Sequence, residues 1–341
     1  MRLIEKVWFD GHSAKWWLVP LLLPFTVLFV LLSSLRRFAF GIGLFKSYSV
    51  NKPVIVVGNI GVGGNGKTPV VIHLVELAKT LGFNPGVISR GYGGKAESYP
   101  YLLSTHSTTA QAGDEPILIF KRCHVPVVVG SDRVANAQKL IALGCDVIIS
   151  DDGLQHYRLQ RDLELIVVDG KRLFGNGLLL PAGPLRESTS RLGNADIVIF
   201  NGESKTTDVD GQIRDKSSLM TLVATKLRHM QTDEEVSLAE FLADNTKVNA
   251  IAGIGSPQRF FDTLHNLGFN LVQQQGFIDH KNFTVNDFNQ FKNDLPLLMT
   301  EKDAVKCQEF AKDNWWYLPV DAQFSEQDEQ ILIESIKQLA S

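Results

Sequence analysis

The chain has 341 residues, 44% of them hydrophobic, and its 34 Lys and Arg face 37 Asp and Glu, which gives a net charge of −3. This length predicts about two domains with full-sized cores, and the near-balance of charge excludes a global basic field that would recruit nucleic acid. The cysteines, Cys123, Cys145 and Cys307, form no C-x-x-C pair, and they are typical of small buried residues in a reducing compartment.

The first predicted element is an apolar N-terminal segment, residues 1–49. Residues 16–35 contain no charge, and about 20 apolar residues suffice to cross a bilayer. Two prolines interrupt the run, and a tryptophan pair at its start favours the headgroup level. A cleaved signal peptide is disfavoured because Asp10 precedes the run and two arginines follow it. We predict a membrane-associated segment that is a single span, an interfacial anchor or a helix packed on the soluble body.

A strand, a glycine-rich loop and a helix are predicted next. Residues 53–58 form a β-branched apolar run typical of a buried parallel strand, and residues 68–81 carry an apolar stripe at helical spacing. The loop between them fits G-x-x-x-x-G-K-[ST], in which backbone N–H groups surround a polyphosphate, the lysine reaches its terminal oxygens and the hydroxyl binds Mg²⁺. The alternative is a chance glycine-rich turn. The flanking elements favour nucleotide binding by Gly61, Val62, Gly63, Gly64, Asn65, Gly66, Lys67 and Thr68.

The remaining pattern predicts the α/β class: a P-loop NTPase-like, mostly parallel sheet over residues 50–200 and a second, smaller α/β domain over 226–341. Residues 201–225 are polar and are predicted to be a linker or surface ribbon. Further strands are expected near 86–89, 125–129, 146–150, 164–168, 196–200, 249–254, 269–273, 296–299 and 315–319, and helices at 132–143, 257–267 and 325–339.

Two carboxylates, Asp151 and Asp152, follow the predicted strand 146–150. In a P-loop fold, a Mg²⁺-associated acid lies at the carboxyl end of a neighbouring strand. The alternative is an ordinary turn, because Asp-Asp-Gly is also good turn chemistry. Two adjacent acids favour the functional interpretation.

Three other motifs are less specific. Asp114 precedes a Glu-Pro pair and fits a helix N-cap and a catalytic role equally well. Arg186 follows a proline-rich segment and is a candidate phosphate ligand, although exposed arginines usually bind nothing. His280 follows an aspartate in a predicted loop, and such a pair is a candidate for proton transfer, although a lone histidine is more often structural.

Taken in order, these motifs resemble those of the tetraacyldisaccharide 4′-kinases, which phosphorylate the lipid A precursor in Gram-negative bacteria. The resemblance covers nearly the whole chain, and the number and order of the motifs carry it. Only Lys281-Asn282-Phe283, after His280, varies the family pattern. The matching segments are the apolar N-terminal helix and residues 58–68, 89–93, 113–116, 130–133, 151–156, 180–187, 277–280 and 300–303.

The resemblance implies transfer of the γ-phosphoryl group of ATP to the 4′-hydroxyl of an acylated glucosamine disaccharide 1-phosphate, with Mg²⁺, at the cytoplasmic face of the bacterial inner membrane. The implied partners are this lipid substrate and the membrane surface, with no nucleic acid and no obligate protein partner. The second domain is expected to close over the site. The implied roles are proton acceptance by Asp114, its tuning by His280, phosphate binding by Lys67, metal binding by Thr68, Asp151, Asp152 and Glu187, and substrate binding by Arg133, Arg186 and Glu187.

Two other classes of protein remain as alternatives. A membrane-attached regulatory NTPase that reads guanine would need N-K-x-D, whereas residues 300–303 place the lysine and aspartate side by side, and residues 151–153 are too short for D-x-x-G. A non-enzymatic membrane adaptor would have no reason to combine Asp114, the acid pair and His280. Dependence of ATP turnover on a lipid acceptor distinguishes a kinase from both.

Overall fold

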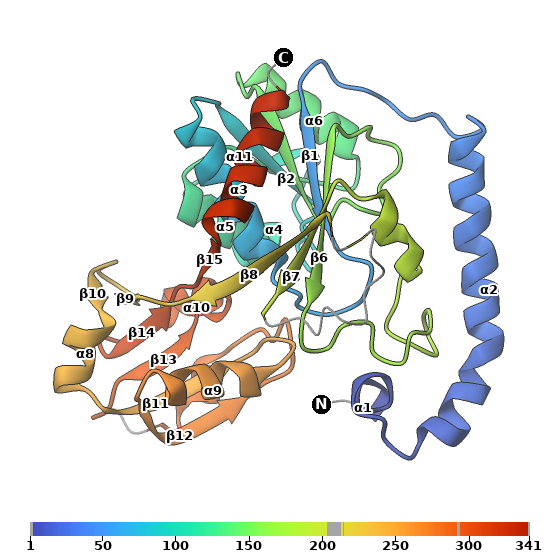
Figure 1. Cartoon of the computed structure of the whole chain (residues 1–341). Helices are drawn as coiled ribbons and strands as arrows, with labels where there is room; N and C mark the ends of the chain where they lie inside the picture. The colour runs from blue at the N-terminus through green and yellow to red at the C-terminus, as the bar shows by residue number, and fades with distance from the viewer. Residues whose placement is uncertain (1–2, 203–212, 214, 292–293, 340–341) are drawn as a thin grey trace.

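The computed structural model of the protein describes residues 3–202, 213, 215–291 and 294–339. Figure 1 shows two lobes, each built on one sheet, and a long N-terminal helix beside them. The first lobe holds the strands β1 (Val54–Gly58), β2 (Pro85–Ser89), β3 (Tyr101–Leu102), β4 (Val127–Val129), β5 (Val147–Asp151), β6 (Leu163–Asp169), β7 (Ile197–Asn201), β8 (Ser217–Val223) and β15 (Asp321–Phe324). Its helices are α3 (Lys67–Thr80), α4 (Thr109–Ala112), α5 (Asp114–Cys123), α6 (Arg133–Ala142), the 3₁₀ helix η1 (Thr189–Asn194) and α11 (Glu326–Gln338).

The first sheet is mostly parallel. In the described part of the chain its nine strands lie in the order β15-β8-β7-β6-β1-β5-β2-β4-β3, and only the two edge strands, β15 and β3, pair antiparallel. The central strands are buried along their whole length. Parallel strands covered by helices on both faces read as continuous apolar runs, which is why their positions were visible in the sequence. The expected α/β class is confirmed.

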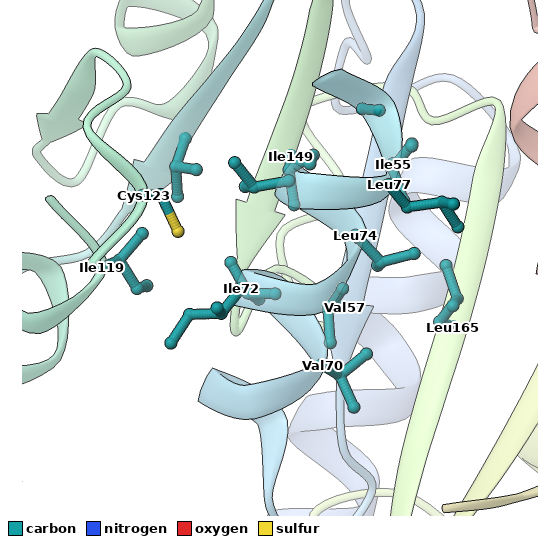
Figure 2. Close-up of a cluster of buried hydrophobic side chains, with 14 of the residues drawn as sticks. Ile55, Val57, Val70, Ile72, Leu74, Leu77, Ile119, Cys123, Ile149 and Leu165 are labelled. Carbon is teal, nitrogen blue, oxygen red and sulfur yellow. The ribbon is translucent and has the colours of Figure 1, made fainter. Parts of the chain in front are cut away.

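Helix α3 fixes the loop that precedes it. Figure 2 shows Val70, Leu74 and Leu77 of α3 gathered with Ile55 of β1 and Ile149 of β5 in one buried cluster. Full burial of one such side chain contributes about 1.5–3 kcal/mol. The helix is therefore held firmly against the sheet, with its N-terminus at the carboxyl end of β1.

The second lobe has its own smaller sheet. Its strands are β9 (Lys226–His229), β10 (Glu235–Ser237), β11 (Lys247–Ala252), β12 (Asn270–Gly276), β13 (Leu297–Thr300) and β14 (Trp315–Leu318), and its helices are α8 (Leu238–Asp244), α9 (Pro257–Asn266), η3 (Val285–Phe288), α10 (Glu301–Cys307) and η4 (Gln308–Phe310). Among the described residues, six strands lie in the order β10-β9-β14-β13-β11-β12. The pairs β11–β12, β11–β13 and β13–β14 are parallel.

The sheet pairing differs from the expected domain boundaries at two places. Strand β8 lies within the segment 201–225, which was expected to be a linker or surface ribbon, and it pairs in parallel with β7; residues 203–212 and 214 of that segment lie outside the described residues. The chain end was expected in the second domain, but β15 pairs with β8, and α11 packs into the first core. Only part of β8 is buried, and such partly polar strands carry a weak sequence signal. The second lobe is thus inserted between β8 and β15.

The N-terminal segment forms α1 (Leu3–Phe9) and α2 (Lys15–Gly41), and α2 runs through both prolines that were expected to interrupt it. Figure 1 shows α2 beside the first lobe. The Thr26 hydroxyl joins the two: it donates to the Leu179 carbonyl at 3.4 Å and accepts from the Ala182 N–H at 3.0 Å. In the described part of the chain, only α2 is long and apolar enough to cross a membrane, and just 6% of its most apolar window is buried. This exposure disfavours a helix packed on the soluble body and is compatible with membrane association.

Candidate active site

The P-loop is shaped by a glycine at the start of α3. Gly66 has a φ of 92°, and a Cβ atom there would lie 2.5 Å from Nδ2 of Asn201. The same Nδ2 group donates a hydrogen bond to the Asn65 carbonyl at 3.1 Å. The end of β7 therefore holds the loop in place, and the backbone N–H groups at the N-terminus of α3 are left as an anion-binding site.

Two cations of the site converge on one carboxylate. Lys67 Nζ lies 3.6 Å from Asp152 Oδ1, and Arg186 Nη1 lies 3.3 Å from Asp152 Oδ2. Burial raises the pKa of Asp152, but the charges of Lys67 and Arg186 outweigh it and hold this pKa below its ordinary value. The structure thus brings together three of the residues predicted from sequence, with Asp152 ionised.

Asp151, the last residue of β5, lies in a different environment. It is buried, Ser89 Oγ donates to its Oδ2 at 3.1 Å, and Arg133 Nη2 donates to its backbone carbonyl at 2.9 Å. Burial and the nearby carboxylates of Glu115 and Asp152 raise the pKa of Asp151 to about 7, despite the charges of Lys67 and Arg133. The positive charges near Asp151 therefore do not balance its burial and the neighbouring carboxylates.

The acid pair meets the requirements of a magnesium site. The Oδ1 atoms of Asp151 and Asp152 are both buried without a hydrogen-bond partner. Mg²⁺ is bound by oxygen ligands, usually one or two carboxylates plus water and phosphate. In the described part of the chain, no group of three or more His, Cys, Asp and Glu side chains is arranged for a metal. The acid pair therefore fits Mg²⁺, and the hydroxyl of Thr68, the residue after Lys67, stays a predicted further ligand.

A hydrogen bond between the lobes joins the other predicted pair. His280 Nδ1 lies 3.0 Å from Asp114 Oδ2, and the Glu115 N–H donates to Asp114 Oδ1 at 3.0 Å. Asp114 begins α5 and is only 6% exposed, whereas His280 lies in the loop after β12 and has a left-handed φ of 58°. Backbone strain of this kind is concentrated at functional sites.

The hydrogen bond between Asp114 and His280 favours the charged form of both side chains. Burial raises the pKa of Asp114, but the hydrogen bond from His280 and the charge of Lys302 outweigh it, so the pKa lies below its ordinary value. The hydrogen bond to Asp114 in turn raises the pKa of His280, although burial opposes this. Asp114 is therefore ionised at neutral pH, which is the protonation state that a proton acceptor needs.

Two predicted site residues have other partners in the structure. Arg133 is 3% exposed, and burial lowers its pKa to about 10. Its Nη2 group donates to the Asp151 carbonyl, while its Nη1 group is buried without a hydrogen-bond partner, and its contact with substrate stays a prediction. Glu187 is 2% exposed and accepts hydrogen bonds from Gln155 Nε2 at 2.8 Å and from the Tyr157 hydroxyl at 3.1 Å. Its role toward metal or substrate stays a prediction.

Sequence reasoning missed two cations that link the lobes. Lys302 Nζ lies 3.1 Å from Glu115 Oε1, and its only sequence signal was its place in the matching segment 300–303. Arg259, on α9, forms a bidentate ion pair with the buried Asp169: Nη1 lies 2.7 Å from Oδ2, and Nη2 donates to Oδ1 at 2.8 Å. Nothing in the local pattern around Arg259 distinguishes it from an exposed helical arginine.

The fold and this geometry agree with the comparisons with known proteins. The sequence profile of the tetraacyldisaccharide-1-P 4′-kinase family matches residues 18–339. Tetraacyldisaccharide 4′-kinases from Colwellia psychrerythraea and Tolumonas auensis are 64% and 49% identical to this chain, and the matches cover 98% and 99% of it and 97% and 98% of those proteins. A crystal structure of LpxK from Aquifex aeolicus in complex with ATP matches with a TM-score of 0.75 at 30% identity, over 94% of this chain and 99% of that one.

Proposed function

Because the chain belongs to the tetraacyldisaccharide-1-P 4′-kinase family, we propose that it transfers the γ-phosphoryl group of ATP to the 4′-hydroxyl of a tetraacylated glucosamine disaccharide 1-phosphate. The observation that best supports this reaction is the joint placement of a P-loop lysine beside an acid pair and of an ionised Asp114 bonded across the lobes to His280. Phosphoryl transfer requires from a protein mainly positioning and charge neutralisation.

Each residue then has a specific task. Lys67 and the backbone N–H groups of the P-loop hold the β- and γ-phosphates. Asp114 accepts the proton as the O–H bond of the sugar hydroxyl breaks, the new O–P bond forms and ADP leaves with the electrons of the broken P–O bond. His280 bonds to Asp114 Oδ2 and the Glu115 N–H donates to Oδ1, so the two contacts fix the orientation of the carboxylate. Thr68 and the acid pair would hold Mg²⁺, which neutralises phosphate charge when bound.

The N-terminal helix fits a substrate whose acyl chains stay in a bilayer. Large apolar side chains of α2, among them Trp16, Leu21 and Phe25, are more than half exposed, at 78%, 60% and 60%. Such a surface matches the cytoplasmic leaflet of an inner membrane, where ATP and the lipid headgroup are both accessible.

A transfer assay tests the proposed function. Labelled γ-phosphate is followed from ATP to tetraacylated disaccharide 1-phosphate in mixed micelles, with Lys67→Ala compared with Lys79→Ala, which removes an exposed lysine at the other end of α3. Labelled lipid is expected from the wild type and Lys79→Ala but not from Lys67→Ala. Acceptor-independent ATP hydrolysis without labelled lipid would instead identify a regulatory NTPase.

A further inference from the structure

Lys302 brings a positive charge from the second lobe to the carboxylates of the first. Its Nζ atom lies 3.8 Å from Asp114 Oδ2, 3.1 Å from Glu115 Oε1 and 3.4 Å from Asp279 Oδ1. The side chain is only 18% exposed, so solvent screens these contacts less than it screens surface ion pairs. A single ammonium group therefore connects α5 with the loop that carries His280.

Lys302 lies at a position on its own helix, α10, where a positive charge is unfavourable. Thr300 caps α10, and its hydroxyl accepts from the Asp303 N–H at 3.1 Å, so Lys302 is in the first turn. A cation there is repelled by the partial positive charge of the helix N-terminus. Its three carboxylate contacts offset that repulsion, so the favourable interactions of this lysine lie outside α10.

We propose that Lys302 is a positioning residue for phosphoryl transfer, one that holds the Asp114 carboxylate across the cleft and balances the negative charge of Glu115 and Asp279 around it. The proposal rests on the proposed function, because Asp114 is the proton acceptor only in that reaction. Lys302 reaches the substrate through Asp114 and is not itself a reacting group.

The charged groups around Asp114 determine how its protonation changes when Lys302 is removed. Glu115 lies next to it on α5, Asp279 and His280 face it from the loop after β12, and α10 presents Lys302 and, further away, Lys306, which is paired with Asp303 at 2.8 Å. Without Lys302, Asp114 keeps its burial and both neighbouring carboxylates, and it loses one of the cations that oppose them. Protonation of Asp114 then becomes easier, and a protonated carboxyl group accepts no proton from the sugar.

The test is the pH profile of acceptor phosphorylation for Lys302→Met, Lys302→Arg and a matched control, Lys281→Met. Lys281 is also a lysine of the second lobe, beside His280, but it is paired with Asp287 at 3.2 Å. Loss of an opposite charge at this range moves a carboxylate pKa by about one unit or more. The acid limb of kcat should therefore move up by about one pH unit in Lys302→Met, with about a tenfold loss on that limb and recovery at neutral pH, where the carboxyl group is ionised again. Lys302→Arg should restore the profile, and Lys281→Met should follow the wild type.

A second variant, Glu115→Gln, retains Lys302 and changes the charge around Asp114 in the opposite direction. Glu115→Gln removes a partly exposed carboxylate, so the acid limb should move down in pH. An unchanged limb in both Lys302→Met and Glu115→Gln would overturn the proposal, as would an equal loss at every pH in Lys302→Met with a normal Glu115→Gln profile. If Lys302→Met fails to fold, as judged by thermal unfolding, Lys302→Gln takes its place, and an unchanged acid limb in that variant would overturn the proposal. A wild type that transfers no phosphate would overturn the kinase itself, and the lysine proposal with it.

Discussion

Asp114 and His280 are expected to act as one unit, and a double-mutant cycle measures this. A positioned general base contributes about 10²- to 10⁴-fold to a rate, so Asp114→Asn should lower kcat by roughly that factor. A hydrogen bond to a charged group contributes about 1.5–3 kcal/mol, which is roughly 10- to 150-fold in rate. The 3.0 Å bond to the buried Asp114 carboxylate places His280→Asn within that range. The double variant should be no slower than Asp114→Asn alone, because the histidine acts through the carboxylate.

The assay is the initial rate of labelled phosphate transfer at saturating ATP, with the affinity for ATP measured separately by calorimetry. Affinity should stay close to that of the wild type in all three variants, because neither residue contacts the P-loop lysine. If the two losses multiply in the double variant, His280 acts independently of Asp114, and the reasoning is wrong. If Asp114→Asn instead loses ATP binding, Asp114 belongs to the metal site.

The same pair predicts a pH-dependent contribution to stability. The folded-state pKa of Asp114 is depressed from 3.8, so its contribution is present above that value and is lost as pH falls through the folded pKa. The pKa of His280 is raised from 6.5, so its contribution is present below 6.5 and is lost as pH rises through the folded pKa. The difference in Tm between wild type and His280→Asn should therefore be largest between these limits and shrink in alkali. A difference that is constant with pH would show that the pair contributes by packing alone.

Three further predictions concern other parts of the molecule. Lys67→Ala should abolish turnover and leave the unfolding temperature unchanged; ordinary rates in this variant would remove the P-loop from the mechanism. Replacing Leu21, Phe25 and Leu28 on the exposed face of α2 by Ser should weaken sedimentation with anionic vesicles, and undiminished binding would place the membrane contact elsewhere. Burial, with the charges of nearby arginines, lowers the pKa of His156 from 6.5 to about 4. Unfolding should therefore take up a proton between these pH values, so the free energy of unfolding should decrease as pH is lowered from 6.5 to 4. The slope of this decrease should be shallower in His156→Gln.

The parts of the fold that sequence predicted are those with a local physical signal. The buried parallel strands are uninterrupted apolar runs, and the P-loop needs its glycines, lysine and threonine at fixed spacing. Strands β8 and β15 gave no such signal, because their pairing joins segments about a hundred residues apart, Ser217–Val223 and Asp321–Phe324. Contacts across so many residues depend on how both lobes pack, and a local pattern does not specify them.

The residues of the candidate site also fall into those that a local sequence pattern predicts and those that it does not. Lys67, Asp151 and Asp152 lie at strand ends and a helix start of one sheet, where topology alone brings them together. Lys302 and Arg259 contribute only through the approach of the second lobe, so each resembled an ordinary helical cation in the sequence. The one hint for Lys302 was its place in the matching segment 300–303, because no helix was predicted there whose first turn would mark a cation as unfavourable.

The division between the lobes also bears on how ATP is protected from water. Burial in the first lobe raises the proton affinity of Asp114, and the described side chains that lower it by hydrogen bond or charge, His280, Lys302 and Lys306, belong to the second lobe; the Glu115 N–H of the first lobe also donates to its Oδ1. Next to the P-loop, a Cβ atom on Gly255 of the second lobe would lie 3.7 Å from the Gly64 nitrogen. The proposed base therefore has three of its stabilising side chains on a lobe that also lies against the nucleotide-binding loop. With the second lobe apart, Asp114 would lose these side chains, and the proposed base would no longer be held in position. The same contacts that promote transfer to the lipid would thus limit futile hydrolysis in its absence.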